Sequence, residues 1–209
     1  MRVNWHERVE TDELILTAYR RALVPLYHRW MADPWLREAT ASEEMSLDEE
    51  YSAQRGWRDD GGKLTFIFFD AKTKQMVGDV NLFELDAKAA EGDYSWGSGA
   101  GVGVPTFEVM VMVGDAGSRR RGLAGAAVRA VVRYAVERLG ARRLVAKIAT
   151  GNTPSRSLFG RLGFREDKVV AAFDEVHCIT EADGVALKLE GKWEIVKDDP
   201  GAGEEEEET

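Results

Sequence analysis

The hydrophobic residues of this chain are gathered in short stretches that polar, glycine-containing segments separate. Stretches rich in β-branched, aromatic and aliphatic residues are typical of buried strands. Residues 72–75 form a turn between two such stretches, so those two are expected to pair as a hairpin. Strands are predicted in residues 13–19, 63–69, 76–83, 106–113, 142–149, 164–172, 175–180 and within 185–196.

Four other segments are predicted to be helices, from their hydrophobic spacing or from residues typical of helix ends. They are residues 21–31, 46–58, 122–139 and 154–162. Ser46 precedes Glu49 by three residues, which is the spacing of a capping box. Gly140 and Gly163 would end the last two helices, and Pro154 suits a first helical turn.

The order of the elements in residues 106–162 is strand, turn, helix, strand and helix. A strand that leads through a helix to another strand predicts a parallel pair joined by a right-handed crossover. Residues 164–172 and 175–180 then read as a closing antiparallel pair, so the chain is predicted to be an α/β or α+β domain. Residues 84–105 are polar and include the run GSGAGVG, and we expect a long loop there.

The charge of the chain is unevenly distributed. The 209 residues include 28 Lys and Arg and 37 Asp and Glu, for a formal charge of −9. Residues 119–165 contain twelve basic residues and one acidic residue, Glu137, whereas residues 198–209 contain seven acidic residues and no basic one. The overall charge argues against a nucleic-acid partner, because phosphate contacts need a basic face. The one basic segment predicts a defined site for an anionic ligand.

Length and composition suggest one domain over residues 1–197, followed by a disordered acidic tail over residues 198–209. Cys178 is the single cysteine, so the chain has no internal disulfide, which fits a reducing compartment. No run of about 18 apolar residues and no apolar signal core at the start are found, so no membrane association is expected. We therefore expect a cytoplasmic protein, with the nucleus as a further intracellular location.

The turn between residues 106–113 and the helix at 122–139 has the features of a phosphate site. Backbone N–H groups at a helix N-terminus, together with the helix dipole, bind phosphate. Gly122 removes a side chain where a phosphate would approach the backbone, and Ala124 is nearly as small. Arg119, Arg120 and Arg121 add positive charge at the same point.

Three classes of ligand compete for such a turn. The glycines at 97–103 lack the spacing of a dinucleotide-binding fingerprint and precede no predicted helix, so that class is rejected. Gly117 and Gly122 have the first spacing of a nucleoside-triphosphate loop, but Leu123 and Ala124 replace its lysine and hydroxyl residue. A nucleotide hydrolase, which would bind ATP with Mg²⁺, is therefore a weak alternative. Coenzyme A has a pyrophosphate and needs no metal, and it remains as the third class.

The run Arg119–Ala124 (RRRGLA) resembles the R/Q-x-x-G-x-G/A motif of the GCN5-related N-acetyltransferases (GNAT). Thirty residues after Gly122, Asn152 opens the stretch NTPS, which is followed by a short predicted helix and LGF, and this is similar to a second element of that family. More narrowly, the chain resembles the eukaryotic N-acetyltransferase-nine-like proteins. The stretches that support this are 40–43, 49–51, 76–83, 108–110 and 146–148, and the resemblance covers roughly residues 13–180.

This resemblance implies the GNAT acyl-CoA N-acyltransferase fold, a mixed and mostly antiparallel sheet with a central splayed parallel strand pair and flanking helices. It also implies acetyl-CoA as co-substrate and no metal. The preceding strand, including Met110 and Val111, would pair with the pantetheine arm. The residues implied in cofactor binding are Met112, Val113, Arg119, Arg120, Arg121, Gly122, Leu123, Ala124, Gly125, Asn152, Ser155 and Phe159.

The implied chemistry is direct attack of an amine on the acetyl thioester. An ammonium group must first lose a proton, usually to a carboxylate through water. Glu108 is the only acid in residues 106–113 and is the first candidate for the base, and Asp79 could bind the amine or act as base. Family members often have a tyrosine seven residues after the Asn152 position, which protonates the departing thiolate. Phe159 stands there and leaves the general acid open.

The sequence therefore predicts an N-acetyltransferase whose acceptor is a primary amine of a protein or peptide. The alternative is a non-catalytic acetyl-CoA-binding protein that acts through partner contacts, and Phe159 motivates it. A structural role, without catalysis or ligand binding, also stays open for three of the candidate residues. Glu108 could be a structural carboxylate, Asp79 a turn residue, and Asn152 the N-cap of the helix that follows.

Overall fold

The computed structural model describes residues 2–96, 103–186 and 190–198 of the chain. Most of the predictions for the glycine-rich run, and those for the acidic tail after Asp198, lie outside the described residues. Asp198 itself is held in place, because its carboxylate lies 2.7 Å from an Arg20 nitrogen and its N–H donates to the carbonyl of His6.

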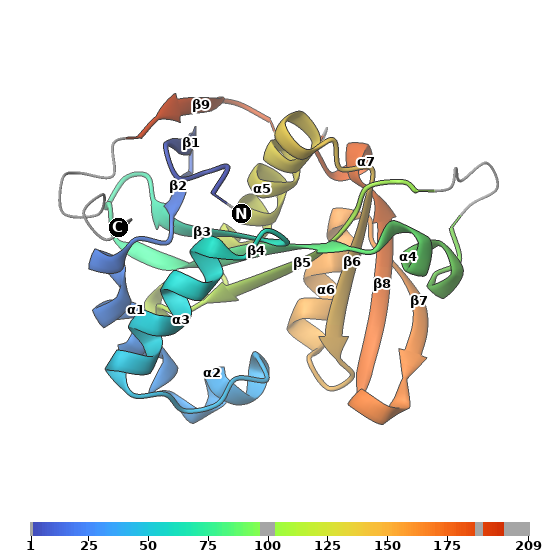
Figure 1. The fold of residues 1–209 in the computed structure, drawn as a ribbon, viewed down its shortest axis with the longest axis horizontal. Helices are drawn as coiled ribbons and strands as arrows, with labels where there is room; N and C mark the ends of the chain where they lie inside the picture. Colours follow the sequence, from blue (N-terminus) through green and yellow to red (C-terminus); the bar gives the residue numbers. More distant parts are fainter. Residues whose placement is uncertain (1, 97–102, 187–189, 199–209) are drawn as a thin grey trace. The chain divides into compact units, whose positions relative to one another are not determined.

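The described strands form one nine-stranded sheet (Figure 1). They are β1 (Glu7–Thr11), β2 (Leu14–Ala18), β3 (Lys63–Asp70), β4 (Met76–Leu85), β5 (Thr106–Val113), β6 (Arg143–Ala149), β7 (Arg165–Val170), β8 (Glu175–Glu181) and β9 (Trp193–Lys197). Their order is β7-β8-β6-β5-β4-β3-β2-β1-β9. β5 and β6 pair in parallel, whereas β1–β2, β2–β3, β1–β9, β6–β8 and β7–β8 pair antiparallel. This mixed, mostly antiparallel sheet with its parallel pair confirms the predicted fold class.

The chain divides into two compact units, which are described separately below. Unit 1 contains Met1–Asn81, Val111–Ala124 and Gly191–Thr209. Unit 2 contains Leu82–Met110 and Gly125–Glu190. Strands β4 and β5 each contribute residues to both units.

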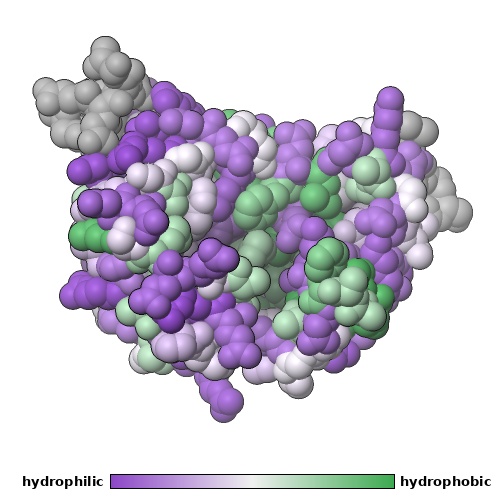
Figure 2. Space-filling view, turned by 60° about the horizontal axis from the view of Figure 1, so that its bottom comes forward, coloured by the Kyte–Doolittle hydropathy of each residue, from purple (hydrophilic) through white to green (hydrophobic). Residues whose placement is uncertain are grey.

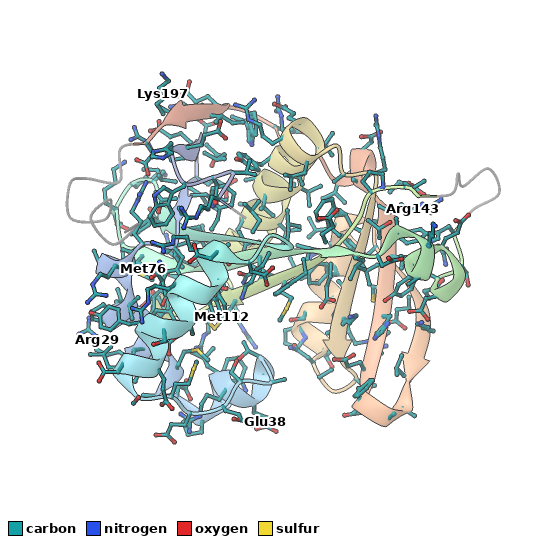
Figure 3. The ribbon with its side chains drawn as sticks, viewed as in Figure 1. Arg29, Glu38, Met76, Met112, Arg143 and Lys197 are labelled. Carbon is teal, nitrogen blue, oxygen red and sulfur yellow. The ribbon has the colours of Figure 1, made fainter. Side chains whose placement is uncertain are left out.

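In unit 1, α1 (Val24–Met31) packs against α3 (Leu47–Asp59), and α3 packs against β3 (Figure 1). Ser46 caps α3 with the predicted capping box, in which it and Glu49 each accept a bond from the other's N–H. Helices and strands share one core, formed by Tyr19, Val24, Tyr27, Met31, Leu36, Ile67, Met76 and Met112. Met76 of β4 and Met112 of β5, both labelled in Figure 3, contribute to this core from neighbouring strands.

In unit 2, which contains α5 (Leu123–Leu139) from Gly125 onward, this helix buries a run of alanine and valine side chains and Tyr134 between Ala126 and Ala135. Arg129 and Arg133 within this run are half-buried. The helix α6 (Thr153–Leu162) packs against β6, and the short α7 (Ala182–Ala186) follows β8. β7 and β8 form the predicted antiparallel pair, with an irregular register between Glu166 and Lys168. Apart from α7, which was not predicted, these elements agree with the predicted ones to within a few residues.

The prediction of an uninterrupted loop over residues 84–105 is wrong, because α4 (Ala87–Asp93) lies within it. Asp86 begins this helix by accepting bonds from the N–H groups of Lys88 and Ala89, and the AKAA sequence that follows has high helix propensity. Strand β1 and helix α2 (Pro34–Ala39) were also not predicted. The start of α2 has a local signal in the sequence, because Asp33 is its N-cap. The described features of β1 are its pairings with β2 and β9.

Charged residues make up 31% of the chain, and a largely hydrophilic surface is expected from that share. Hydrophilic residues cover most of the face shown in Figure 2, and apolar residues reach it in separate places. No helix in the described part of the chain is long and apolar enough to cross a membrane.

Candidate active site

The turn after β5, in unit 1, is built on close backbone contacts. The N–H of Asp115 donates to the carbonyl of Val77 at 3.0 Å. A Cβ added at Gly78 would overlap the carbonyl oxygen of Met112, and a Cβ at Gly114 would overlap the ring of Trp30. Both positions therefore need glycine, since any side chain would separate the turn from β4 and from α1.

Gly122, immediately before α5, has the geometry that the phosphate-site prediction needs. Its φ is +83°, in the left-handed region, and a Cβ added there would meet no atom within 4 Å. The packing therefore does not require glycine at this position, although the backbone conformation favours it. The open space in front of the first turn of α5 suits a phosphate group bound by backbone N–H groups.

The three arginines of the turn have different surroundings. Arg119 donates to the carbonyl of Val113 at 3.2 Å, and its guanidinium lies 4.6 Å from the ring centroid of Trp35. Arg121 donates to Asp70 at 2.8 Å. The pKa of Asp70 is lowered by bonds from backbone N–H groups and, less strongly, by this arginine.

Arg120 differs from its neighbours. Its side chain is exposed, and no hydrogen bond or ion pair of this side chain is recorded with any described residue. The predicted role of the three arginines in phosphate binding stays a prediction. Arg119 and Arg121 shape the turn, and Arg120 is the one that is free to meet a ligand.

The second predicted element lies in unit 2. Asn152 is the N-cap of α6, because its Oδ1 accepts a hydrogen bond from the N–H of Ser155 at 3.1 Å. Its Nδ2 can still donate a hydrogen bond to a ligand. Phe159 is buried and packs edge-to-face against Phe164, with ring centroids 5.0 Å apart. Gly125 is also in this unit, and a Cβ there would lie 3.3 Å from Leu158.

The parallel ladder between β5 and β6 is short. It joins Thr106–Glu108 to Arg143–Val145, although β5 continues to Val113 and β6 to Ala149. Beyond Glu108 the β5 backbone has no partner on β6 among the described residues. Backbone N–H and C=O groups without such a partner could pair with a ligand arm.

Glu108 lies at the last rung of that ladder and forms an ion pair. Lys147 of β6 approaches its carboxylate to 2.7 Å, and the side chain of Glu108 is 13% exposed. On the next strand, His177 is the register partner of Lys147. Its ring connects the Tyr94 hydroxyl, at 3.2 Å, with the Glu175 carboxylate, at 3.1 Å. Unit 2 thus carries a line of polar groups on β5, β6 and β8.

Asp79, the other candidate base, is in unit 1 on β4 and is 3% exposed. One of its oxygens accepts a bond from the Asn81 amide, and the other has no hydrogen-bond partner. Burial raises the pKa of Asp79 to about 6, while Asn81 and Lys63 act in the opposite direction. Burial also lowers the pKa of Lys63 to about 8. A carboxyl group with such a pKa can accept and release protons near neutral pH.

The predicted residues thus fall into two sets. Unit 1 contains Asp79, Met112, Val113 and the turn Arg119–Ala124, and unit 2 contains Glu108, Gly125, Asn152, Ser155 and Phe159. Sequence reasoning missed Lys147, Lys63 and the Tyr94–His177–Glu175 series. The one available signal was a lysine within each of two strands predicted to be buried, because a buried lysine needs a partner.

No group of three or more metal-binding side chains is found among the residues that the structure describes. A family model for the acetyltransferase (GNAT) domain matches residues 13–165. An N-acetyltransferase 9-like protein of Caenorhabditis elegans is 36% identical over 181 residues, which cover 84% of this chain and 86% of that protein. The human protein named alpha/beta-tubulin-N-acetyltransferase 9 is 35% identical over 187 residues, which cover 84% of each chain.

The solved structures show the same fold. A spermidine N-acetyltransferase from Vibrio cholerae, in complex with CoA and spermine, matches with a TM-score of 0.68 at 17% identity. The match covers 83% of this chain and 98% of that one. At this identity the likeness concerns the architecture alone.

Proposed function

Because the chain belongs to the GNAT acetyltransferase family and is an acetyl-CoA-dependent N-acetyltransferase, we propose that its acceptor is a primary amine of a protein or peptide. The observation that carries this proposal is the 35% identity to the human protein whose name specifies alpha/beta-tubulin as its acceptor. Family membership also favours catalysis over the alternative of an acetyl-CoA-binding protein without activity.

The turn before α5 fits the pyrophosphate of acetyl-CoA. Gly122 provides open space and a left-handed backbone, and the exposed Arg120 provides a positive charge. We assign the phosphates to Arg119–Ala124 and Gly125, and the arm to Met112, Val113, Asn152, Ser155 and the neighbourhood of Phe159. Acetyl-CoA supplies an activated acetyl group on a thiol that leaves readily.

In this proposal the carboxylates of Asp79 and Glu108 each accept one of the two protons that the acceptor nitrogen loses. The acceptor enters as an ammonium ion and must lose one proton before it can attack, and Asp79 takes that proton through water. The neutral amine then forms a bond to the acetyl carbon, and the bond from that carbon to sulfur breaks. Glu108 takes the second proton from the new amide nitrogen and returns it, through water, to the departing thiolate.

The surroundings of Glu108 support its proposed role as the group that accepts the second proton. It lies in the last residue pair of the ladder between β5 and β6, and Lys147 fixes the position of its carboxylate. Phe159 is packed in the core and has no proton to donate, so the proton that Glu108 returns through water is the one that the thiolate receives. A CoA thiol is acidic enough to leave as the thiolate before this proton arrives.

The acceptor class is tested by measuring CoA release from acetyl-CoA with a panel of amines. The panel contains peptides with the amino-terminal sequences of α- and β-tubulin, the same peptides with blocked amino termini, lysine peptides and spermidine. We expect turnover with free amino-terminal peptides and none with the blocked forms. Turnover with spermidine alone would overturn the proposal and point to a polyamine acceptor instead.

We also propose a cytoplasmic location, in agreement with the single cysteine. Cys178 is buried, and burial raises the pKa of its thiol, so it is kept from reaction with other thiols. Fractionation of cells that express the tagged chain would test this. Recovery in the secreted fraction would contradict it.

A further inference from the structure

Unit 1 contains a group of buried polar atoms that lack hydrogen-bond partners. They are the Tyr19 hydroxyl, Nδ1 of His28, both carboxylate oxygens of Glu50 and Oδ1 of Asp79. An unsatisfied buried polar group costs about 1–3 kcal/mol, and more when it is charged. Native proteins leave few such groups, so several that act on one another in one region need an explanation.

One short separation and several charge interactions relate these groups to one another. Nδ1 of His28 on α1 lies 3.8 Å from an oxygen of Glu50 on α3, which is too long for a hydrogen bond. The negative charges of Glu50 and Asp79 both help to raise the pKa of the Tyr19 hydroxyl, after the larger effect of burial. Tyr19 is therefore within electrostatic reach of both carboxylates.

Aromatic rings form the walls of this region. The ring centroid of Tyr19 lies 5.0 Å from that of Tyr27 and 5.8 Å from that of Trp57. Lys63 of β3 lies over the Trp57 ring, 3.2 Å from its centroid. The charged and titratable groups that act on Asp79, Tyr19 and Tyr27 come from several elements. They are Lys63 of β3, Glu50 and Tyr51 of α3, and Asp79, Tyr19 and Tyr27 themselves.

The other side of Asp79 is fixed by a series of hydrogen bonds. Thr65 donates through its hydroxyl to the Asn81 amide oxygen at 2.7 Å, and the Asn81 nitrogen donates to Oδ2 of Asp79. Asn4 donates to the Thr65 carbonyl at 2.8 Å. This arrangement orients the carboxylate and leaves Oδ1 as its available oxygen.

The opposite end of the group reaches the surface. His28 lines a surface hollow of about 330 Å³, whose other lining residues are Met31, Ala32, Glu44, Met45 and Ser46. The side chain of His28 is 31% exposed, whereas that of Glu50 is 1% exposed. Buried polar groups that lack protein partners are commonly bonded to internal water. Water between these side chains would give a continuous hydrogen-bonded route from Asp79 to the hollow.

We propose that Tyr19, Glu50 and His28, with water between them, carry the proton taken up by Asp79 to solvent at this hollow. The inference rests on the proposed function, in which Asp79 deprotonates the acceptor ammonium. The bond from nitrogen to hydrogen breaks, the proton moves to Oδ1 of Asp79, and each later group accepts one proton and releases one. No electron changes place, and one proton leaves for each acetyl group transferred.

The experiment compares three variants that keep side-chain size, Tyr19→Phe, Glu50→Gln and His28→Gln, in the full chain. The control is Glu44→Gln, which lines the same hollow but is 79% exposed and outside the series. Each of the three is expected to lower kcat about tenfold while the KM for acetyl-CoA stays unchanged, and Glu44→Gln should behave as wild type. Thermal melting confirms that each variant is folded.

A second measurement separates proton transfer from a structural role. A small buffer such as imidazole can replace a missing proton carrier at the solvent end, so added imidazole should restore most of the kcat of His28→Ala but not that of Glu50→Gln. Wild-type kcat in all three variants would overturn the proposal, and so would a loss in His28→Ala that imidazole does not change. Each variant is compared with wild type on the same acceptor, so this result is independent of which amine proves to be the natural one.

Discussion

Nζ of Lys147 lies 2.7 Å from a carboxylate oxygen of Glu108, and both side chains are more than half buried. The two residues come from β5 and β6, the pair of parallel strands whose ladder ends at Glu108. A lysine at this distance keeps the carboxylate in one place, because a partly buried charge without its partner would be costly. The ion pair thus positions Glu108 at the end of the ladder.

Glu108→Gln should lower kcat by about a hundredfold or more, because a carboxamide keeps the shape of the side chain but cannot accept the proton. The affinity for acetyl-CoA should stay within a factor of two of wild type, since the turn before α5 is untouched. The measurements are steady-state CoA release and calorimetric titration with acetyl-CoA.

The matched control for this change is Glu137→Gln, which removes a carboxylate from the exposed ion pair with Arg133 on α5. It should leave both the rate and the affinity unchanged. If Glu108→Gln retained the wild-type rate between pH 6 and 9, Glu108 would not act as a base.

Gly122→Asp should abolish detectable acetyl-CoA binding, whereas Gly122→Asn should weaken it by less than about tenfold. Asp and Asn are among the residues that tolerate the left-handed φ of +83°, and the open space accommodates either. Only the charge differs, and a carboxylate would repel the phosphates. Titration of acetyl-CoA into each variant checks this, and equal affinities would place the phosphates elsewhere.

Most of the strands, and the turn with its glycine before α5, could be predicted because their evidence is local. The strand at residues 106–113 was expected with the bounds that β5 has, since Pro105 and Gly114 flank an unbroken β-forming run. The capping box at Ser46 and the glycine before α5 are likewise encoded within a few residues. A pattern of this kind needs no knowledge of the rest of the fold.

The environments of the functional side chains could not be predicted in the same way, because they depend on residues far apart in the sequence. Glu108 meets Lys147 only through the parallel pairing of β5 with β6, and Asp79 is buried beside Lys63 only through the packing of unit 1. Arg119 and Arg121 looked equivalent to Arg120, but Trp35 and Asp70 engage them. Helix α4 was missed because its hydrophobic contacts are few and its cap lies in a polar segment.

Gly78→Ala should lower the free energy of unfolding by more than about 2 kcal/mol, because the added methyl group overlaps the carbonyl oxygen of Met112, and backbone cannot move aside cheaply. Urea unfolding measures the change. The control is Gly56→Ala, on the exposed side of α3 with no atom near the new methyl group, which should raise stability by about 0.5–1 kcal/mol. Equal stabilities of the two variants would contradict the close contact of β4 with β5.

Asp79→Asn should gain stability relative to wild type as the pH rises. Burial raises the pKa of Asp79 from its usual 3.8 to about 6, so the folded protein holds this proton more tightly than the unfolded chain does. The resulting stabilisation is complete below pH about 4 and is lost as the pH rises through about 6, because the buried carboxylate must then be charged. Asparagine never carries that charge. The stability difference between variant and wild type should therefore grow by about 1 kcal/mol between pH 5 and pH 7.

Urea unfolding of the Asp79→Asn variant and the wild type at the two pH values measures this difference. The control is Asp183→Asn, at an exposed site, which should show no such growth. A difference that stays constant over this range would mean that Asp79 is ionised at pH 5 in the folded protein, and it would then be too weak a base to take a proton from the acceptor.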